Sequence, residues 1–345
     1  MASSGAQISK PKWDETIDEF RALGGVADNI EHGVGALGRG LLLSDPSTPA
    51  QIAVPENLLI DVDDVVFQKG QFRIKKDANV PDRERAFFES FENELSWGDG
   101  GHSECESYLE SVDKLPIAIR EALSRDVGLT LPWSTGMSDE RIQRRFIRSR
   151  SITYEGRRKL MPVLELVNHG VEGCKFKFEK GISIAGSFES EMLAHYGLYD
   201  PYGVLDNWGF SSAEPVAFSI PAVLTVDSHR LVISRKLTNS AVRGPFRVPT
   251  VERDGNTFRI SFMMLGHADY PRLSKGIFYQ LMEDIGQQNA EALFDEVRRF
   301  NIQKFLSVLE LLDEHQGPLI VTLRQMCRQQ IAAITHSIGT RKIDG

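Results

Sequence analysis

Three short groups of residues in this 345-residue chain have types and spacing suited to chemistry. The first is the glycine-rich stretch GVGALG at residues 33–38, whose main chain can approach a ligand closely because glycine has no side chain. The second is Asn168-His169, which supplies directional hydrogen-bond donors and acceptors at the end of the apolar run LMPVLELV. The third is AHYG at 194–197, followed after a short loop by NWGF at 207–210. Taken singly, the second and third also fit a structural polar pair and aromatic turn packing.

The glycine stretch matches the G-x-G-x-x-G pattern of dinucleotide-binding enzymes, but its surroundings do not. That pattern binds a dinucleotide only between a strand and a helix of a βαβ unit. Here residues 12–31 predict a helix before the glycines, ending near Gly24-Gly25, and LLLSDPSTP after them places Asp and Pro too early for a helix. A nicotinamide-dependent oxidoreductase is therefore disfavoured, and the stretch is interpreted as a flexible loop with exposed backbone groups.

The elements that must position these residues alternate in kind along the chain. Residues 32–66 contain short apolar runs broken by turn residues, which predict short strands. Residues 80–149 have apolar positions at helical spacing, with Ser138 as an expected helix N-cap. Residues 160–265 return to short strands, and from about Ser274 the pattern is helical to the end. The sequence predicts an α+β protein.

Read in order, these groups resemble the motifs of SET-domain protein methyltransferases, in the branch that contains the Rubisco large-subunit methyltransferase. ALGRGLLL resembles the family's glycine loop, RSRS at 148–151 its Arg-Ser-Arg segment and MPVLELVNHG its "PxxDxxNH" strand. AVPENLLI resembles its "VPxxL" strand, MLAHYG its "xxxYG" strand and NWGF its closing "xYGF". The resemblance covers roughly residues 32–218 at the level of motifs.

The resemblance implies a fold and a division into domains. We expect an N-terminal tail and helix at 1–25, and a SET domain at 26–218 built as a β-clip of short strands with a helical insertion at about 67–145. An all-helical C-terminal domain, similar to a substrate-binding domain, is expected at 219–345 and is mainly helical from about 274.

The resemblance also implies the cofactor S-adenosylmethionine (AdoMet). Main-chain groups of Leu37, Gly38 and Arg39 would contact it. The guanidinium of Arg150 would pair with its carboxylate through two parallel hydrogen bonds. The expected cofactor-binding residues are Leu37, Gly38, Arg39, Arg150, Asn168, His169 and Tyr196.

By the same resemblance, Tyr196 is the catalytic tyrosine, and Trp208 and Phe210 line the substrate channel. The implied reaction is transfer of a methyl group to a lysine side-chain nitrogen of a protein substrate, with no metal. Two alternatives stay open: methylation of histidine, and a SET fold that acts as an interaction module with weak or lost catalysis. Trp208 favours the second alternative, because it has no hydroxyl where many relatives carry a second tyrosine.

Composition limits the partners and the location. The formal net charge of −8 argues against broad nucleic-acid binding, which needs a basic face. No apolar run approaches the roughly 18 residues of a membrane span. Cys105, Cys174 and Cys327 are too far apart for a CxxC metal site and fit a reduced compartment, so we expect a cytoplasmic protein. The Ser-rich start faintly resembles a transit peptide, but a short disordered tail is favoured.

Four arginines predict a basic face on one helix. Arg141, Arg144, Arg145 and Arg148 follow one another at spacings of three and four, which places them side by side on a helix. Such a face is either simply solvated or a docking patch for an acidic segment of a protein substrate.

Overall fold

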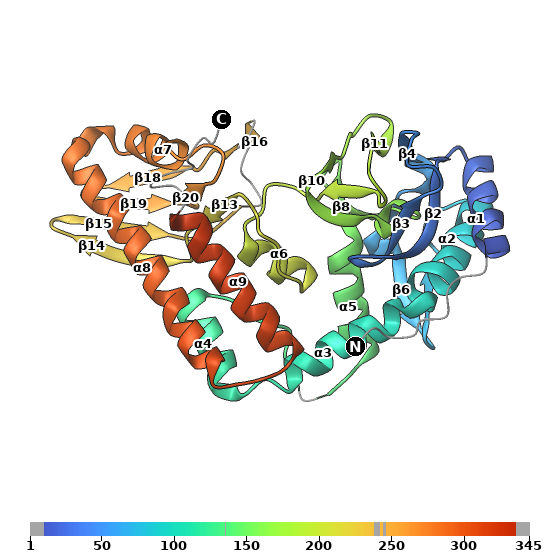
Figure 1. The fold of residues 1–345 in the computed structure, drawn as a ribbon, viewed down its shortest axis with the longest axis horizontal. Coiled ribbons are helices and arrows are strands. Elements are labelled where there is room, and N and C mark those ends of the chain that lie inside the picture. The colour runs from blue at the N-terminus through green and yellow to red at the C-terminus, as the bar shows by residue number, and fades with distance from the viewer. Residues whose placement is uncertain (1–9, 135, 238–241, 244–245, 336–345) are drawn as a thin grey trace. The chain divides into compact units, whose positions relative to one another are not determined.

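The computed structural model describes residues 10–134, 136–237, 242–243 and 246–335, and the chain divides into two compact units (Figure 1). The amino-terminal unit comprises Met1–Glu110 and Ser134–Gly197, and the carboxy-terminal unit comprises Ser111–Trp133 and Leu198–Gly345. This division differs from the predicted one. Part of the expected insertion, and the expected SET residues after 197, belong to the unit that contains the C-terminal helices. The first nine residues of the predicted tail lie outside the described residues.

Short strands dominate the amino-terminal unit. Strands β2 (Ile30–Gly35) and β3 (Gly38–Leu43) form an antiparallel hairpin, so the glycine stretch is not the flexible loop that was expected. Gly38 closes its two-residue turn with φ of +100°, a conformation that favours glycine. The other strands of this unit are β1 (Val26–Asp28), β4 (Ala50–Pro55), β5 (Ile60–Asp61), β6 (Val65–Gln68), β7 (Gln71–Ile74), β8 (Ser151–Tyr154), β9 (Arg157–Leu160), β10 (Asn168–Lys175), β11 (Gly181–Gly186) and β12 (Leu193–His195).

Strand pairing in this unit is mainly antiparallel. One sheet has the order β1-β4-β11 and another has the order β5-β9-β8. Strands β6 and β7 form a hairpin at the start of the expected insertion, which becomes helical only from Asp82. Strand β10 pairs in parallel with β12, and this pairing places Asn168 opposite Leu193.

Helices cover these strands. They are α1 (Lys10–Ala22), α2 (Asp82–Phe91), the irregular helical segment η3 (Glu92–Gly101), α3 (His102–Asp113), which continues into the other unit, and α5 (Asp139–Arg150). Aromatic side chains from separate elements form part of the core, with the ring centroids of Phe72 and Phe146 4.5 Å apart and those of Trp97 and Phe146 5.1 Å apart. Burial of such rings removes a large apolar area from water and so stabilises this unit.

Helix α5 confirms one local prediction and overturns another. Ser138 is its N-cap, because its hydroxyl accepts a hydrogen bond from the Arg141 main-chain nitrogen at 3.3 Å. The four arginines do not share one solvated face: Arg141 and Arg145 are each only 9% exposed. The guanidinium of Arg145 lies 4.1 Å from the ring centroid of Tyr108, so it packs as part of the interior.

The carboxy-terminal unit combines helices with sheets, so it is not all-helical as expected. Its sheets have the orders β14-β15-β19-β18, β13-β20 and β16-β17, the last formed by β16 (Val242–Arg243) and β17 (Phe246–Arg247). Its C-terminal helices begin at Leu273, as predicted. Its helices are α4 (Ile117–Val127), α6 (Pro201–Trp208), α7 (Leu273–Leu281), α8 (Gln287–Asp313) and α9 (Pro318–Thr335). Its other sheet strands are β13 (Val216–Phe218), β14 (Ala222–Val226), β15 (His229–Ile233), β18 (Val251–Asp254), β19 (Thr257–Ile260) and β20 (Met264–His267).

A buried charged cluster fixes the start of α6. Asp200 is fully buried and caps the helix by accepting a hydrogen bond from the Gly203 nitrogen at 2.9 Å. Its carboxylate also accepts from the Arg235 guanidinium at 2.5 and 3.1 Å, and from Gln330 at 2.8 Å. Because every oxygen of this carboxylate is hydrogen-bonded, the buried charge is compensated.

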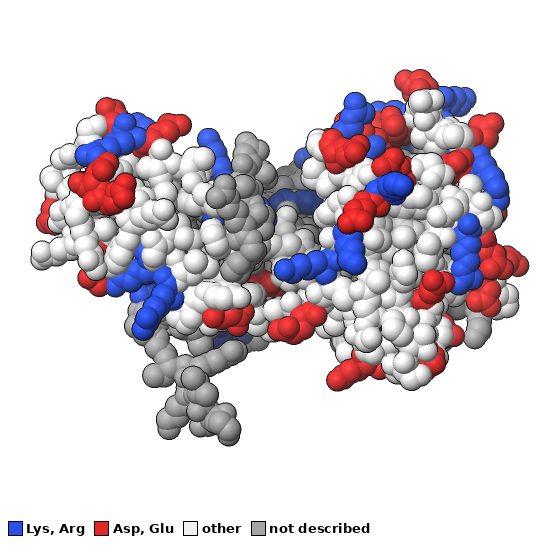
Figure 2. Space-filling model, turned by 90° about the horizontal axis from the view of Figure 1, so that it is seen from above, with Lys and Arg blue, Asp and Glu red and all other residues white. Residues whose placement is uncertain are grey.

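Among the described residues, no helix is long and apolar enough to cross a membrane. On the face drawn in Figure 2, the basic side chains of the described residues are interspersed with acidic ones.

Candidate active site

Three chain segments meet beside the glycine hairpin in the amino-terminal unit. Residues 190–192 pair with β3: Leu43 donates its main-chain N–H to the Ser190 oxygen at 2.9 Å, and Met192 donates to the Leu41 oxygen at 2.8 Å. The next residues form β12, which pairs with β10. The segment 190–195 therefore lies between β3 and β10, and it brings the residues after Gly38 close to Asn168.

Asn168 links these segments through its carboxamide. Its Nδ2 donates to the main-chain oxygen of Arg39 at 2.9 Å and to Glu191 Oε1 at 2.7 Å. Gly40 makes this arrangement possible, since an added Cβ there would lie 2.5 Å from Asn168 Nδ2 and 2.6 Å from Glu191 Oε1. The side chain of Asn168 thus fixes the path of the β3 main chain at Arg39.

Tyr196 lies at the end of β12, against the start of β10. Its hydroxyl donates to the main-chain oxygen of Val167 at 2.6 Å, and its main-chain nitrogen donates to His169 Nδ1 at 3.3 Å. The His169 and Tyr196 ring centroids are 5.0 Å apart. Burial raises the pKa of the Tyr196 phenol well above its ordinary value, so the hydroxyl keeps its proton at neutral pH.

The Arg39 guanidinium points to a different set of partners from its main chain. It donates to both carboxylate oxygens of Glu104 at 3.1 Å and to the main-chain oxygen of Ser96 at 3.3 Å. Asp99 lies 3.7 Å away, beside the kink in η3 where Gly100 has φ of +99°. Arg39 therefore joins the hairpin to η3 and α3.

Burial of His32 on β2, together with the charge of Arg39, lowers the pKa of the His32 imidazole to about 4. His32 is therefore neutral at neutral pH.

Glu92 and Glu165 form a buried carboxyl pair in the amino-terminal unit. Glu165 accepts a hydrogen bond from the Ser96 hydroxyl, and its Oε1 lies 3.5 Å from Arg150 Nε. Burial raises the pKa of Glu165 to about 7. Burial and the nearby Glu165 charge raise the pKa of Glu92 well above its ordinary value, and neither Glu92 oxygen has a hydrogen-bond partner among the described residues. Two adjacent carboxyls in a dry site cannot both ionise without cost, so this pair holds at least one proton at neutral pH.

Arg150 lies within this interior cluster. Its guanidinium is 4.7 Å from the ring centroid of Phe146, and Nη1 donates to Ser149 Oγ at 3.3 Å. Nε is buried and makes no hydrogen bond to a described residue, although the Glu165 carboxylate is nearby. Arg150 thus carries a buried donor that remains unused in this arrangement.

The structure brings together four of the nine sequence-predicted site residues. Asn168, His169, Tyr196 and the Arg39 main chain are adjacent, whereas Leu37 is 57% exposed at the hairpin tip. Gly38 is exposed beside Leu37, and a Cβ added to it would meet no atom within 4 Å.

The two predicted channel residues belong to the carboxy-terminal unit. There Trp208 packs edge-on against Tyr199, with ring centroids 5.0 Å apart, and Phe210 is 37% exposed. Their role in a substrate channel stays a prediction.

Sequence reasoning missed two residues on which the site depends, Glu191 and Gly40. Glu191 is only 8% exposed, and the sequence signal for it was a carboxylate directly before the apolar run MLA. Gly40 follows the three glycines of the G-x-G-x-x-G match. The need for glycine at this position becomes visible only in the structure, where Asn168 lies beside it.

Cysteine and possible metal ligands add no further chemistry here. Cys105, Cys174 and Cys327 are free thiols. Within the parts of the chain that the structure describes, no three His, Cys, Asp or Glu side chains are grouped as metal ligands.

No protein-family model matches the chain. An uncharacterized protein of Aquifex aeolicus (strain VF5) is 30% identical over 90 residues, which are 26% of this chain and 74% of that protein. The chain belongs to the same family as that protein, whose description gives no activity. A crystal structure of the SET domain of LSMT bound to lysine and AdoHcy is similar with a TM-score of 0.40 and 12% identity, covering 95% of this chain and 90% of that chain.

A methyl group at position 40 tests the link between the segments. In Gly40→Ala, Asn168 and Glu191 must move away from the new methyl and give up their hydrogen bonds, so we expect the free energy of unfolding to fall by about 1–3 kcal/mol. Urea denaturation measures this change. The matched control is Gly276→Ala in α7, where an added Cβ meets nothing within 4 Å and the change should be neutral or slightly stabilising. Equal stability of Gly40→Ala and wild type would contradict the assigned packing.

The carboxyl pair predicts a pH dependence of stability. Because the pKa of Glu165 is raised to about 7 in the folded state, the folded protein binds its proton more tightly than the unfolded chain, and this group favours folding less as pH rises through that value. We expect Glu165→Gln, which carries no charge, to become progressively more stable relative to wild type between about pH 5 and about pH 8. Urea denaturation across this range measures the difference. Glu140→Gln, whose side chain is 80% exposed, should show a flat difference; a flat difference for Glu165→Gln as well would mean that Glu165 ionises normally.

Proposed function

We propose that this chain is an AdoMet-dependent protein methyltransferase of the SET-domain type that transfers a methyl group to a lysine side-chain nitrogen. The observation that carries the proposal is the Asn168 carboxamide, which binds the Arg39 main chain and Glu191 immediately beside Tyr196. These residues come from three distant motifs whose order along the chain resembles that family. Their meeting at one place is what a shared cofactor and substrate site requires.

The residues present fit the expected cofactor in two respects. Gly40 leaves no side chain between β3 and Asn168, so the β3 main chain lies against the carboxamide. The buried Arg150 Nε, which has no hydrogen-bond partner among the described residues, is a donor suited to a carboxylate. Under this proposal the main chain of residues 37–39 holds the cofactor together with Asn168, His169 and Arg150.

Bound AdoMet would supply an electrophilic methyl group on a positively charged sulfur. The protein's part is to place an uncharged amine in line with that group, since a protonated lysine has no lone pair. A partly dry site disfavours the ammonium form and so lowers the pKa of an entering lysine. Placement of this kind is the largest contribution that these residues can make to the rate.

Tyr196 acts in this mechanism by orienting the substrate amine. Its raised pKa keeps the phenol protonated, which makes it a poor base at neutral pH. The hydrogen bond from its hydroxyl to the Val167 oxygen fixes the direction of the O–H, and the contact with His169 fixes the ring. A fixed hydroxyl oxygen can hold the amine in one orientation without taking its proton.

We propose that the substrate is a protein and that the enzyme acts in the cytoplasm. Histidine is the alternative methyl acceptor. A second candidate function is a SET-fold interaction module without turnover. Trp208 favours it, because its indole carries no hydroxyl and packs on Tyr199.

Removal of one hydroxyl tests the catalytic assignment. Tyr196→Phe keeps the ring but loses the hydrogen bond to Val167, so we expect unchanged AdoMet affinity and a loss of methyl transfer of about 100-fold or more. The measurement is incorporation of labelled methyl from AdoMet into proteins of a cell lysate, with affinity measured by calorimetry. Tyr154→Phe is the matched control, since its hydroxyl donates to Glu56 away from this site and its loss should leave turnover unchanged.

The outcomes separate the candidates. Wild-type turnover by Tyr196→Phe would show that Tyr196 is not the catalytic tyrosine. Binding of AdoMet by the wild-type protein without any labelled product would favour the interaction module instead.

A further inference from the structure

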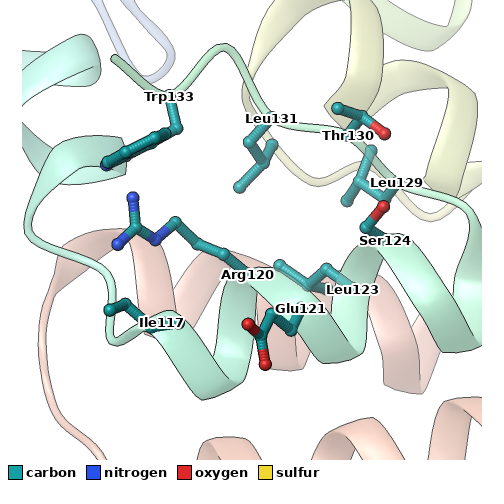
Figure 3. A pocket seen from close by; sticks show the side chains of 9 residues that line it. All are labelled: Ile117, Arg120, Glu121, Leu123, Ser124, Leu129, Thr130, Leu131 and Trp133. Carbon is teal, nitrogen blue, oxygen red and sulfur yellow. The ribbon is translucent and has the colours of Figure 1, made fainter. Parts of the chain in front are cut away.

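A cavity in the carboxy-terminal unit has no part in the site described above. Its volume is about 430 Å³, and it lies between helix α4 and the extended segment 129–133 that follows it (Figure 3). The lining residues are Ile117, Arg120, Glu121, Leu123, Ser124, Leu129, Thr130, Leu131 and Trp133. No residue with an expected role in methyl transfer is among them.

Local chain geometry builds this cavity. Gly128 ends α4 in the left-handed conformation, with φ of +72°, and its N–H bonds to the Leu123 oxygen. Leu129 donates to the same oxygen at 2.9 Å, so the chain reverses direction sharply. It then runs back along α4 until Trp133 stacks on Arg120, 4.1 Å from guanidinium carbon to ring centroid. The reversal at Gly128 therefore fixes one end of the cavity, and the contact of Trp133 with Arg120 closes the other end.

The polar and apolar groups of the cavity are separated. Figure 3 shows Arg120 and Trp133 at one end, the hydroxyls of Ser124 and Thr130 at the other, and leucine side chains between them. The carboxylate of Glu121 points away from the space between the walls. The cavity thus offers an apolar middle and a single positive charge at one end.

Arg120 is the unusual group in this cavity. Its Nε and Nη1 are buried and have no hydrogen-bond partner among the described residues. Buried donors of a charged group without an acceptor are costly, and an anion is the partner that compensates them. Trp133, which covers the guanidinium, is 49% exposed, so its indole can move aside with little loss of packing and expose the donors to an entering anion.

We propose that this cavity binds a small amphipathic carboxylate, with the carboxylate on Arg120 and an apolar body against Leu123, Leu129 and Leu131. The volume lies within the range of about 300–1,000 Å³ that is usual for small-molecule sites, and a mainly apolar lining with few polar groups is typical of them. A guanidinium suits a carboxylate because it donates two parallel hydrogen bonds. The proposal does not rest on methyl transfer.

Calorimetric titration with octanoate tests the proposal on the intact chain. We expect saturable one-to-one binding, and binding at least about 10-fold weaker for octanamide, which has the same chain without the charge. Arg120→Gln should weaken octanoate binding by about 10-fold or more and leave octanamide unchanged. Arg120→Lys keeps the charge but not the paired donors, so its affinity for octanoate should lie between those of the wild type and Arg120→Gln. Arg125→Gln on the same helix is the control, because that guanidinium is 70% exposed and pairs with Asp126.

Trp133 provides a second readout. Octanoate should change the tryptophan fluorescence of the wild-type protein, since the indole moves when the carboxylate enters. Trp133→Phe should abolish this change. Absence of saturable binding to the wild-type protein would overturn the proposal, and so would equal affinity for octanoate and octanamide. Tighter binding of the peptide acetyl-Leu-Glu-amide than of octanoate would also overturn it, in favour of a protein partner.

Discussion

The hydrogen bonds of the Asn168 carboxamide are the interaction on which the candidate site depends. One nitrogen joins Arg39, 129 residues earlier in the chain, to Glu191, 23 residues later. Main-chain pairing of residues 190–192 with β3 brings the segments together, and this link fixes the β3 main chain at Arg39. Gly40 is the steric condition for the link, because any side chain at that position would occupy the space of both partners. The site thus depends on two hydrogen bonds of Asn168 and on the absence of a side chain at Gly40.

The two arginines near this link differ in how fully acidic groups compensate their charge. The Arg39 guanidinium is bound on two sides by Glu104 and Asp99, whereas Arg150 lies against Glu165 with its Nε unused. The carboxyl pair Glu92 and Glu165 retains a proton because burial opposes a second negative charge. Arg150 is therefore less fully compensated than Arg39, and a ligand carboxylate would find its partner more readily at Arg150.

Local patterns in the sequence predicted local structure well. The strands at 32–66, the helices from Asp82 and from Leu273, and the Ser138 cap follow from periodicity and from nearest neighbours. The mixture of helices and short strands confirms the predicted α+β class. Periodicity could not reveal that Arg141 and Arg145 are buried, since a face of arginines has the same spacing whether it meets water or Tyr108.

Long-range contacts account for what sequence reasoning missed. Glu191 and Gly40 acquire their roles only when residues far apart in sequence meet, and the division into units depends on how segment 111–133 packs with the C-terminal helices. The Arg120 cavity arises in the same way, from a helix and the strand-like segment after it, without any recognisable motif. Motif order predicted which residues to examine, and packing determined which of them touch.

Calorimetric titration of AdoMet into the wild-type protein and into Asn168→Ala measures whether this link supports a cofactor site. We expect saturable binding to the wild type and at least about 10-fold weaker binding to the variant, because the variant loses two hydrogen bonds that place the β3 main chain. Circular dichroism should show that both proteins are folded. Absence of AdoMet binding to the wild-type protein, or equal affinity in the two folded proteins, would contradict the account.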